Sequence, residues 1–267
     1  MTSENNPAVL VENRGNVAVI TINRPDARNA VNSAVANGLG IALEQADQNP
    51  EIRAIVLTGA GDKSFCAGAD LKAIASGEGI NPTDKAHRKW GFAGTVSHAI
   101  STPLIAAVNG TALGGGTELV LSADLAIAAE RATFGLPEVK RGLIAGAGGA
   151  FRIVEALPKK IGMEILLTGR AITATQAADL GLINHVVPDA EVLDAAIVLA
   201  EEIAANAPLA VQASKRLAQG IVDREVPGET AQWSANTKEI MTVFSSKDAR
   251  EGPRAFAEKR APVWRAE

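Results

Sequence analysis

The hydrophobic residues in the first half of the chain fall into short runs that are separated by turn residues and by amphipathic stretches. Four runs rich in Val, Ile, Leu and Ala predict buried β-strands: residues 17–22, 52–57, 104–108 and 125–129. Residues 9–12 are expected to pair with the first run through the turn at residues 14–16. This spacing of strands, with long connections between most of them, predicts a layered α/β domain with largely parallel pairing.

Between these strands the apolar residues repeat with the period of a helix. Residues 33–48 place Val35 and Leu39 on one face, and Ser33 is the predicted N-cap. A second helix is expected at residues 84–100, after a loop that is rich in Gly, Ser and Asn. A third is expected to follow a glycine turn and to end at Ser122.

After about residue 148 the pattern becomes mostly helical, interrupted by one short strand at residues 182–187. Val192, Ala196, Leu199 and Ile203 lie in register on one amphipathic helix. Further helices are expected at residues 149–157, 160–167, 173–179, 209–221, 230–244 and 247–259. The C-terminal third is therefore predicted to be a helical extension of the α/β domain.

Composition narrows the class of protein. The chain has 267 residues, 47% of them hydrophobic, and a net charge of −4 without a basic run, which argues against a nucleic-acid surface. Its single cysteine, Cys66, forms no internal disulfide. The N-terminus lacks the features of a signal peptide, and the apolar runs are shorter than the ~20 residues of a membrane helix. We expect a cytoplasmic globular protein.

Two turns of small residues could present unpaired backbone amides. Ala67, Gly68 and Ala69 follow a buried strand, and Asp70 and Leu71 could begin a helix after them. The second turn holds three consecutive glycines, Gly114, Gly115 and Gly116, at the predicted start of a helix. Amides at such turns suit a negatively charged oxygen. Each turn taken alone could equally be a close packing contact.

Glu118 and Glu138 are the candidate proton-transfer groups. Glu118 lies in the first turn of the predicted helix, where a carboxylate also serves as a cap in many proteins. Glu138 follows Pro137 in a glycine-rich segment, where an exposed loop carboxylate is the ordinary alternative. Two carboxylates combined with two amide-presenting turns are what proton transfer next to a carbonyl requires.

Other chemistries fit the sequence less well. Gly59 and Gly61 begin a dinucleotide-like pattern, but Ser64 stands where its third glycine belongs. Cys66 lies in an apolar turn and is expected to be an inert side chain. The three histidines lack the spacing of zinc ligands, so no metal and no redox cofactor is expected.

With these motifs the sequence resembles the crotonase family, also called the enoyl-CoA hydratase/isomerase family. The resemblance covers nearly the whole chain, through the motifs Arg24-Pro-x-x-x-Asn29-Ala30, Phe65-x-Ala-Gly-Ala-Asp-Leu71, Asn109-Gly to Glu118, Phe134-Gly-x-Pro-Glu138, Gly146-Ala-Gly-Gly149 and Leu167-Thr-Gly-Arg170. It implies a core of ββα units that form a spiral over residues 1–195, and a helical oligomerisation region over residues 196–267 that builds trimers or hexamers.

The resemblance also implies roles for individual residues. The amides of Ala69 and Gly115 would form an oxyanion hole for the thioester oxygen of an acyl-CoA substrate. Glu118 and Glu138 match the two glutamates of the family's hydratases, which add water to a 2-enoyl-CoA or catalyse the reverse dehydration. Residues expected to line the substrate channel are Arg28, Ala30, Ala67, Gly68, Asp70, Leu71, Gly114 and Gly116. Coenzyme A would be part of the substrate, and no separate cofactor is implied.

A second likeness leaves undecided which acyl group the substrate carries. Asp248-Ala-x-Glu-Gly-Pro253 and Pro262-Val-Trp264 resemble the carnitinyl-CoA dehydratase (crotonobetainyl-CoA hydratase) branch of the family, while Ala69 and the segment 145–148 depart from its pattern. The alternatives to a general hydratase are therefore this branch, an enoyl-CoA isomerase, and a non-catalytic acyl-CoA-binding member of the fold.

Overall fold

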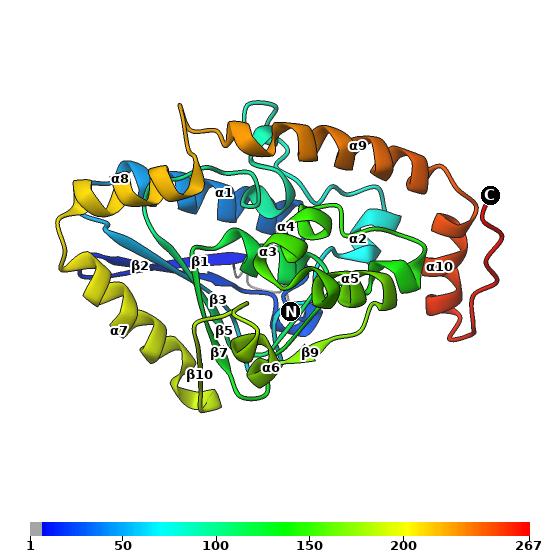
Figure 1. Ribbon diagram of the computed structural model, residues 1–267, viewed down its shortest axis with the longest axis horizontal. Helices are drawn as coiled ribbons and strands as arrows, with labels where there is room; N and C mark the ends of the chain where they lie inside the picture. Colours follow the sequence, from blue (N-terminus) through cyan, green and yellow to red (C-terminus); the bar gives the residue numbers. More distant parts are fainter. Residues whose placement is uncertain (1–6) are drawn as a thin grey trace, which may run out of the picture.

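The computed structural model describes residues 7–267, and a six-stranded sheet forms its centre (Figure 1). In spatial order its strands are β1 (Val9–Arg14), β2 (Val17–Ile22), β3 (Ala54–Gly59), β5 (Leu104–Val108), β7 (Leu125–Ala129) and β10 (His185–Val187). The first two strands form an antiparallel hairpin, as expected, and all the other neighbours are parallel. Strands β3 and β5 are buried along their whole length, which explains why their sequences are uniformly apolar.

A smaller second sheet lies beside the first and was not predicted. Its strands, in spatial order, are β4 (Ser64–Cys66), β6 (Thr111–Leu113), β8 (Thr133–Gly135) and β9 (Ile172–Thr173). Each of them has only two or three residues, too few to show an alternation of polar and apolar positions. The order strand–strand–helix repeats along the chain, so the expected core of ββα units is confirmed.

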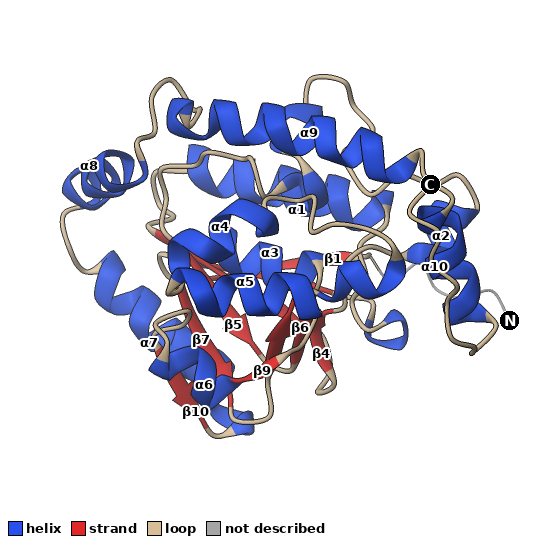
Figure 2. Ribbon diagram, turned by 45° about the vertical axis from the view of Figure 1, so that its right-hand side comes forward, coloured by secondary structure: helices blue, strands red, loops and turns tan. Residues whose placement is uncertain are grey.

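Helices cover the sheets on several sides (Figure 2). The helices of the first 180 residues are α1 (Ser33–Gln48), α2 (Leu71–Ala75), α3 (Gly115–Ser122), α4 (Gly149–Ala156), α5 (Lys159–Thr168) and α6 (Ala174–Asp179). Short 3-10 turns are η1 (Pro25–Ala27), η2 (Arg88–Trp90), η3 (Phe92–Gly94) and η4 (Pro137–Arg141). Helix α1 buries Val35 and Leu39 as expected, but its N-cap is Asn32, whose side chain accepts from the Val35 amide.

The prediction of a helix at residues 84–100 is wrong. The segment forms only the turns η2 and η3, because three of its residues adopt left-handed backbone angles. Gly91 has φ +72°, Ala93 +56° and Gly94 +66°, values that no α-helix contains. Two of the three are glycines, which pay no steric penalty in this region. Gly91 and Gly94 could have indicated this break in the sequence, but the apolar residues around them favoured the prediction of a helix.

The C-terminal part is helical, as predicted. It comprises η5 (Asp189–Glu191), α7 (Val192–Ala204), α8 (Pro208–Gln219), η6 (Pro227–Glu229), α9 (Thr230–Phe244) and α10 (Asp248–Ala257). The expected division after residue 195 falls inside α7, which packs on strands β3, β5 and β7 of the main sheet. The packing therefore places α7 with the core, and α8 to α10 extend beyond it. None of the helices in residues 7–267 is long and apolar enough to cross a membrane.

Candidate active site

The first amide-presenting turn connects β4 to α2. Gly68 has φ +88°, and its carbonyl accepts from the Val31 amide at 2.8 Å. The amide of Asp70 in turn donates to the Val31 carbonyl at 2.9 Å, so Ala69 is held between two cross-chain hydrogen bonds. Among the described residues the Ala69 amide itself donates to no protein acceptor. The backbone is thus fixed around an N–H group that is left available.

Asp70 and Arg24 hold the end of this turn. The Asp70 carboxylate caps α2 by accepting from the amides of Lys72 at 3.1 Å and Ala73 at 3.2 Å. It also pairs with the Arg24 guanidinium at 2.9 Å. Both contacts lower the pKa of Asp70 against the opposing effect of burial, which is the largest single influence. Asp70 therefore stabilises the turn as an ionised cap.

The second turn packs directly against the first. Gly114 (φ +55°) is the N-cap of α3, and Gly115 is the first residue of that helix. A Cβ atom placed on Gly68 would stand 3.0 Å from the Gly115 nitrogen. A Cβ atom on Gly116 would overlap the carbonyl oxygen of Cys66. Glycine is therefore required at these positions because two backbones meet there, and the two predicted turns are brought together.

Glu118 is buried at the start of α3, with an exposed fraction of 3%. Its Oε1 atom accepts from the amides of Ala147 at 2.7 Å and Gly149 at 2.9 Å. These amides belong to the glycine-rich loop of residues 145–149, which leads into α4. The loop approaches closely, since a Cβ atom on Gly149 would stand 2.9 Å from both Cγ and Oε1 of Glu118. Glu118 is therefore not an ordinary solvent-exposed capping carboxylate, which was the alternative for a residue in the first turn of a helix.

Glu138 reaches the same place from η4. Pro137 begins this turn, and the Glu138 side chain lies against the glycine turn of α3, where a Cβ atom on Gly114 would stand 2.8 Å from Oε1. Its Oε2 atom is buried and has no hydrogen-bond partner within residues 7–267. An unpartnered buried carboxylate oxygen is costly and calls for an explanation. Glu138 is therefore not an exposed loop carboxylate, which was the ordinary alternative for its position in the sequence.

The two carboxyl groups share one electrostatic environment. Burial and, to a smaller extent, the charge of Glu138 raise the pKa of Glu118 to about 8, against the lowering effect of the Gly149 and Ala147 amides. Burial also raises the pKa of Glu138, to about 7. Because a negative charge on Glu138 opposes the ionisation of Glu118, the two groups favour a state in which they hold one proton between them. Such a pair contains a base and an acid at neutral pH.

The raised pKa values predict how stability changes with pH. The folded protein binds protons at these two groups more tightly than the unfolded chain, so their contribution to stability is greatest below the ordinary value of 4.5 and is lost as pH rises toward about 7–8. We expect Glu118→Gln to be more stable than the wild type at pH 8, by several degrees in Tm. Thermal unfolding of both proteins between pH 5 and pH 8.5 would measure this gap. A gap that does not widen with pH would contradict the raised pKa.

The remaining predicted site residues lie along the edge of the first turn. Arg28 is exposed, in the left-handed region at φ +55°, and its carbonyl accepts from the Ala67 amide at 3.1 Å. Ala30 is buried, while Ala67 and Leu71 are exposed. These residues therefore form a rim beside the paired turns, and Arg28 is the charged group on it.

Two residues that hold the site together belong to the motifs of the sequence but were given no role there. Asn29 is fully buried and donates from Nδ2 to the carbonyls of Ala60 at 2.9 Å and Ser64 at 2.7 Å. Asn109 holds the same loop by donating to the carbonyls of Gly59 and Gly61, at 2.7 Å each. Each is a polar residue next to an apolar run, which could have indicated a buried hydrogen-bonding role. The sequence could not identify their partners, because these lie about 30 to 50 residues away.

Cys66 is buried next to this site, and burial raises the pKa of its thiol to about 12. A thiol in that environment is not a nucleophile at neutral pH, which agrees with the expected inert side chain. Its Sγ accepts from the Gly68 amide at 3.4 Å.

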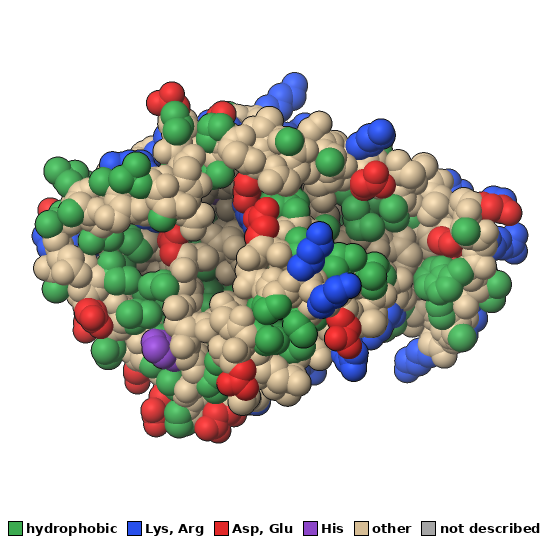
Figure 3. Space-filling view, in the orientation of Figure 1, with side chains coloured by type: hydrophobic (Ala, Val, Ile, Leu, Met, Phe, Trp, Pro, Cys, Tyr) green, Lys and Arg blue, Asp and Glu red, His purple; other side chains and the backbone are tan. Residues whose placement is uncertain are grey.

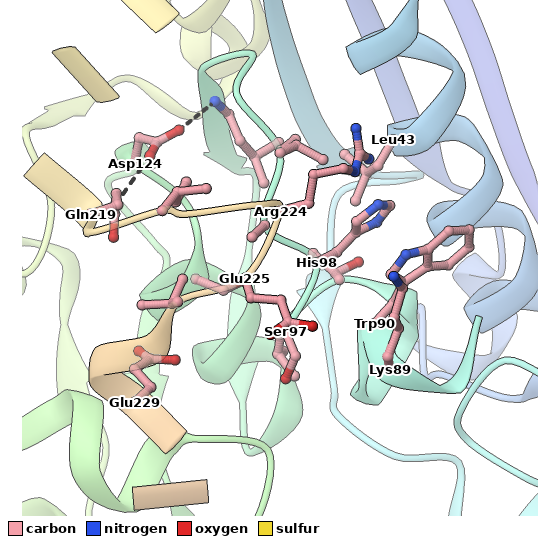
Figure 4. A pocket seen from close by; sticks show the side chains of 18 of the residues that line it. Leu43, Lys89, Trp90, Ser97, His98, Asp124, Gln219, Arg224, Glu225 and Glu229 are labelled. Carbon is pink, nitrogen blue, oxygen red and sulfur yellow. Dashed lines mark hydrogen bonds between the residues drawn. The ribbon is translucent and has the colours of Figure 1, made fainter. Parts of the chain in front are cut away.

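A cavity of about 310 Å³ lies between α1, η2 and the segment that joins α8 to α9 (Figure 4). Neither Glu118 nor Glu138 lines it. Several charged groups on its wall are paired: Lys215 with Asp124 at 2.7 Å and Arg152 with Glu229 at 2.6 Å, while the His98 ring lies within hydrogen-bond distance of Glu44, at 2.8 Å. Paired charges stabilise the packing of the C-terminal helices and give no sign of a second reaction site.

Comparison with known proteins gives a consistent picture. A family model described as "Enoyl-CoA hydratase/isomerase" matches residues 12–267. An enoyl-CoA hydratase of Mycobacterium tuberculosis is 43% identical over 267 residues, which cover 98% of this chain and 97% of that protein. A carnitinyl-CoA dehydratase of Salmonella typhi is 42% identical over 94% of this chain and 95% of that protein. The crystal structure of a carnitinyl-CoA hydratase from Mycobacterium avium is 61% identical, with a TM-score of 0.96, over 98% of this chain and 100% of that one.

Proposed function

The chain belongs to the enoyl-CoA hydratase/isomerase family, and from this membership and the site described above we propose how it works as an enzyme. It is a hydro-lyase that adds water across the 2,3 double bond of a 2-enoyl-CoA thioester, or catalyses the reverse dehydration. The observation that carries the mechanism is the contact between the two glycine/alanine turns, with Glu118 buried at the start of α3 and the Glu138 carboxyl group against Gly114.

The amides of Ala69 and Gly115 form the oxyanion hole. Both belong to turns held rigid by neighbouring hydrogen bonds, and both are free of protein acceptors in the described part of the chain. As water adds at Cβ, negative charge moves to the thioester oxygen and forms an enolate. Donors fixed in advance stabilise this charge without reorganising, and the loss of one typically raises the barrier by about 3–4 kcal/mol.

Glu118 and Glu138 move the protons. The ionised Glu118 orients the water molecule and takes its proton as the oxygen attacks Cβ. The protonated Glu138 then delivers a proton to Cα and collapses the enolate. One proton held between the two carboxyl groups supplies one base and one acid at neutral pH. The assignment of base to Glu118 and acid to Glu138 is the one that the family resemblance implies, and it runs against the order of the two pKa values, so hydration requires the proton to lie on Glu138 when the substrate is bound. The two groups exchange these roles in dehydration.

Coenzyme A lies along the rim that Arg28, Ala30 and Ala67 form. The exposed Arg28 guanidinium offers a positive charge to the phosphates of coenzyme A, and the small side chains let the thioester approach the turns. Gly68, Asp70, Leu71, Gly114 and Gly116 complete the channel wall. The single cysteine, which can form no internal disulfide, supports a cytoplasmic location.

The protein is a homotrimer or a hexamer of two trimers. Large apolar side chains are exposed on the C-terminal helices, where Leu209 is 78%, Leu217 85% and Met241 69% accessible. Figure 3 shows such hydrophobic side chains at the surface over α8 and α10. Contiguous exposed apolar side chains mark protein–protein interfaces, and copies of the same chain are the partners that this family implies.

A second candidate function concerns the acyl group. The 61% identity to a protein named carnitinyl-CoA hydratase favours a substrate that carries a quaternary ammonium group, such as crotonobetainyl-CoA. Such a cation is bound by aromatic or acidic side chains. The reaction at the double bond would be the same, so only the substrate preference separates the two candidates.

The experiment is a set of thioesters assayed by loss of the enoyl-thioester absorbance. We expect hydration of crotonyl-CoA with kcat of about 1–10³ s⁻¹. At least ~10-fold higher kcat/KM for crotonobetainyl-CoA would assign the second candidate. Product analysis distinguishes hydration from double-bond migration, which would indicate an isomerase. Binding of all the thioesters without turnover of any would indicate a non-catalytic member of the fold.

A further inference from the structure

The position of Glu118 depends on one loop. Residues 145–149 supply the two amides, from Ala147 and Gly149, that converge on Oε1 of the carboxylate. Hydrogen bonds to the ionised form oppose the cost of burying a carboxylate. Whatever fixes the shape of this loop therefore decides both where the carboxylate points and how readily it ionises.

One face of α9 packs on the outside of that loop. Trp233, Asn236 and Ile240 are spaced three and four residues apart, so they lie on the same side of the helix. A Cβ atom on Gly148 would stand 3.1 Å from the Trp233 ring, and one on Gly146 would stand 2.8 Å from Ile240 Cδ1. Figure 1 shows α9 running across the molecule next to α4, which begins where the loop ends.

Asn236 supplies a directed contact within this face. Its side chain is only 8% exposed, and Nδ2 donates to the carbonyl of Gly146 at 2.7 Å. Gly146 directly precedes Ala147, so the hydrogen bond acts on the peptide group that presents an amide to Glu118. A buried carbonyl that loses its donor is costly, and the loop would move to find another partner.

Helix α9 is itself fastened at its start. Glu229 accepts from Arg152 of α4 at 2.8 Å and 2.6 Å, and from Trp233 Nε1 at 2.9 Å. Arg152 also donates to the Val96 carbonyl at 2.8 Å. Glu229 stands on the wall of the cavity of Figure 4. These contacts tie α9 to α4, so Asn236 acts from a fixed support.

We propose that Asn236 is a positioning residue, which holds the loop of residues 145–149 in the shape that aims two backbone amides at the Glu118 carboxylate. The consequence for turnover rests on the proposed hydratase function. The geometric claim does not, because it concerns only the loop and the carboxylate. The charged and titratable groups that face Glu118 are Glu138 of η4, Arg152 of α4 and Cys66 of β4, and none of them changes in the test below.

The test compares Asn236→Ala and Asn236→Leu with Thr237→Ala. Leu is close to Asn in size and cannot donate, so it removes the hydrogen bond without a large cavity. Thr237 is the exposed neighbour on α9, and its hydroxyl bonds only within the helix, to the Trp233 carbonyl at 2.9 Å. The control therefore perturbs the same helix on the side away from the loop.

Two readouts are measured on the full-length protein. Infrared titration of the Glu118 carboxyl band, assigned by its loss in Glu118→Gln, measures the pKa without any turnover. Both Asn236 variants are expected to raise that pKa by about 0.5–1 unit, because the amides no longer stabilise the ionised form. With crotonyl-CoA, kcat is expected to fall about 10- to 100-fold at a nearly constant KM, and the acidic limb of the pH profile to move upward.

The outcomes separate the two claims. An unchanged Glu118 pKa in both Asn236 variants overturns the positioning role, as does an equal shift in Thr237→Ala. A raised pKa with wild-type kcat also overturns it, since the loop would then have loosened without displacing the carboxylate. A wild-type protein that hydrates no enoyl-CoA overturns the proposed function, while the infrared titration still decides the role of Asn236.

Discussion

Replacing Glu118 with Gln is expected to lower kcat for hydration by about 10²–10⁴-fold while the protein stays folded. The Gln side chain keeps the size of Glu, and its oxygen can still accept from the amides of Ala147 and Gly149. It cannot take a proton from water. Steady-state assays with crotonyl-CoA, together with circular dichroism and thermal unfolding, would measure the loss and show that it is chemical. Glu138→Gln is expected to cause a comparable loss by removing the proton donor.

Glu155→Gln is the matched control for these variants. Glu155 is exposed on α4, the helix that the Glu118-binding loop opens, and its replacement changes the net charge by the same amount. We expect its kcat to equal that of the wild type. If Glu118→Gln or Glu138→Gln retained wild-type turnover, that residue would have no part in the mechanism, and the shared-proton account of the pair would be wrong.

Gly116→Ala is expected to reduce both stability and turnover, through backbone geometry alone. A Cβ atom at this position would overlap the carbonyl oxygen of Cys66, which is backbone and has no rotamer to change. Helix α3 must then move away from β4, at a cost of about 1–3 kcal/mol or more for overpacking. The shift would separate the amides of Ala69 and Gly115, and a displacement of ~1 Å can cost about 10²-fold in rate. Urea unfolding and kcat would measure the two effects.

Gly228→Ala provides the comparison for this glycine. It lies in η6, where a new Cβ atom would meet no other atom within 4 Å, and its backbone is not in the left-handed region. A change within about 0.5 kcal/mol and a normal kcat are expected there. A Gly116→Ala protein as stable and as active as the wild type would mean that the two turns do not need their close contact.

The packing of α9 connects proton transfer by Glu118 to the C-terminal helices. Its face of Trp233, Asn236 and Ile240 covers the loop that holds Glu118, although these residues lie more than 80 positions further along the chain. The same C-terminal helices carry the exposed apolar residues expected at the interface between subunits. Assembly and proton transfer are thus supported by neighbouring parts of one helical region.

The sequence predicted those features that depend on residues close together along the chain. The long strands and helices followed from the period of apolar residues, and the helix expected at residues 173–179 forms, with Thr173 and Gln176 as a capping box at its start. The glycine turns and the two glutamates were also recognised from their order along the chain. The helix expected at residues 84–100 failed because left-handed residues interrupt it, and the strands of the second sheet were too short to show a period.

The sequence alone therefore determined which groups the chain offers: a fold built of ββα units, two bends of small residues, and a pair of carboxylates. Only the tertiary structure decided that Gly68 meets the nitrogen of Gly115, and that Glu118 is buried beside Glu138 under a loop that α9 supports. The physical reason is that burial, shared protons and backbone contacts depend on groups distant in sequence. No local pattern of residues records those distances, whereas folding brings the groups to within a few ångströms of one another.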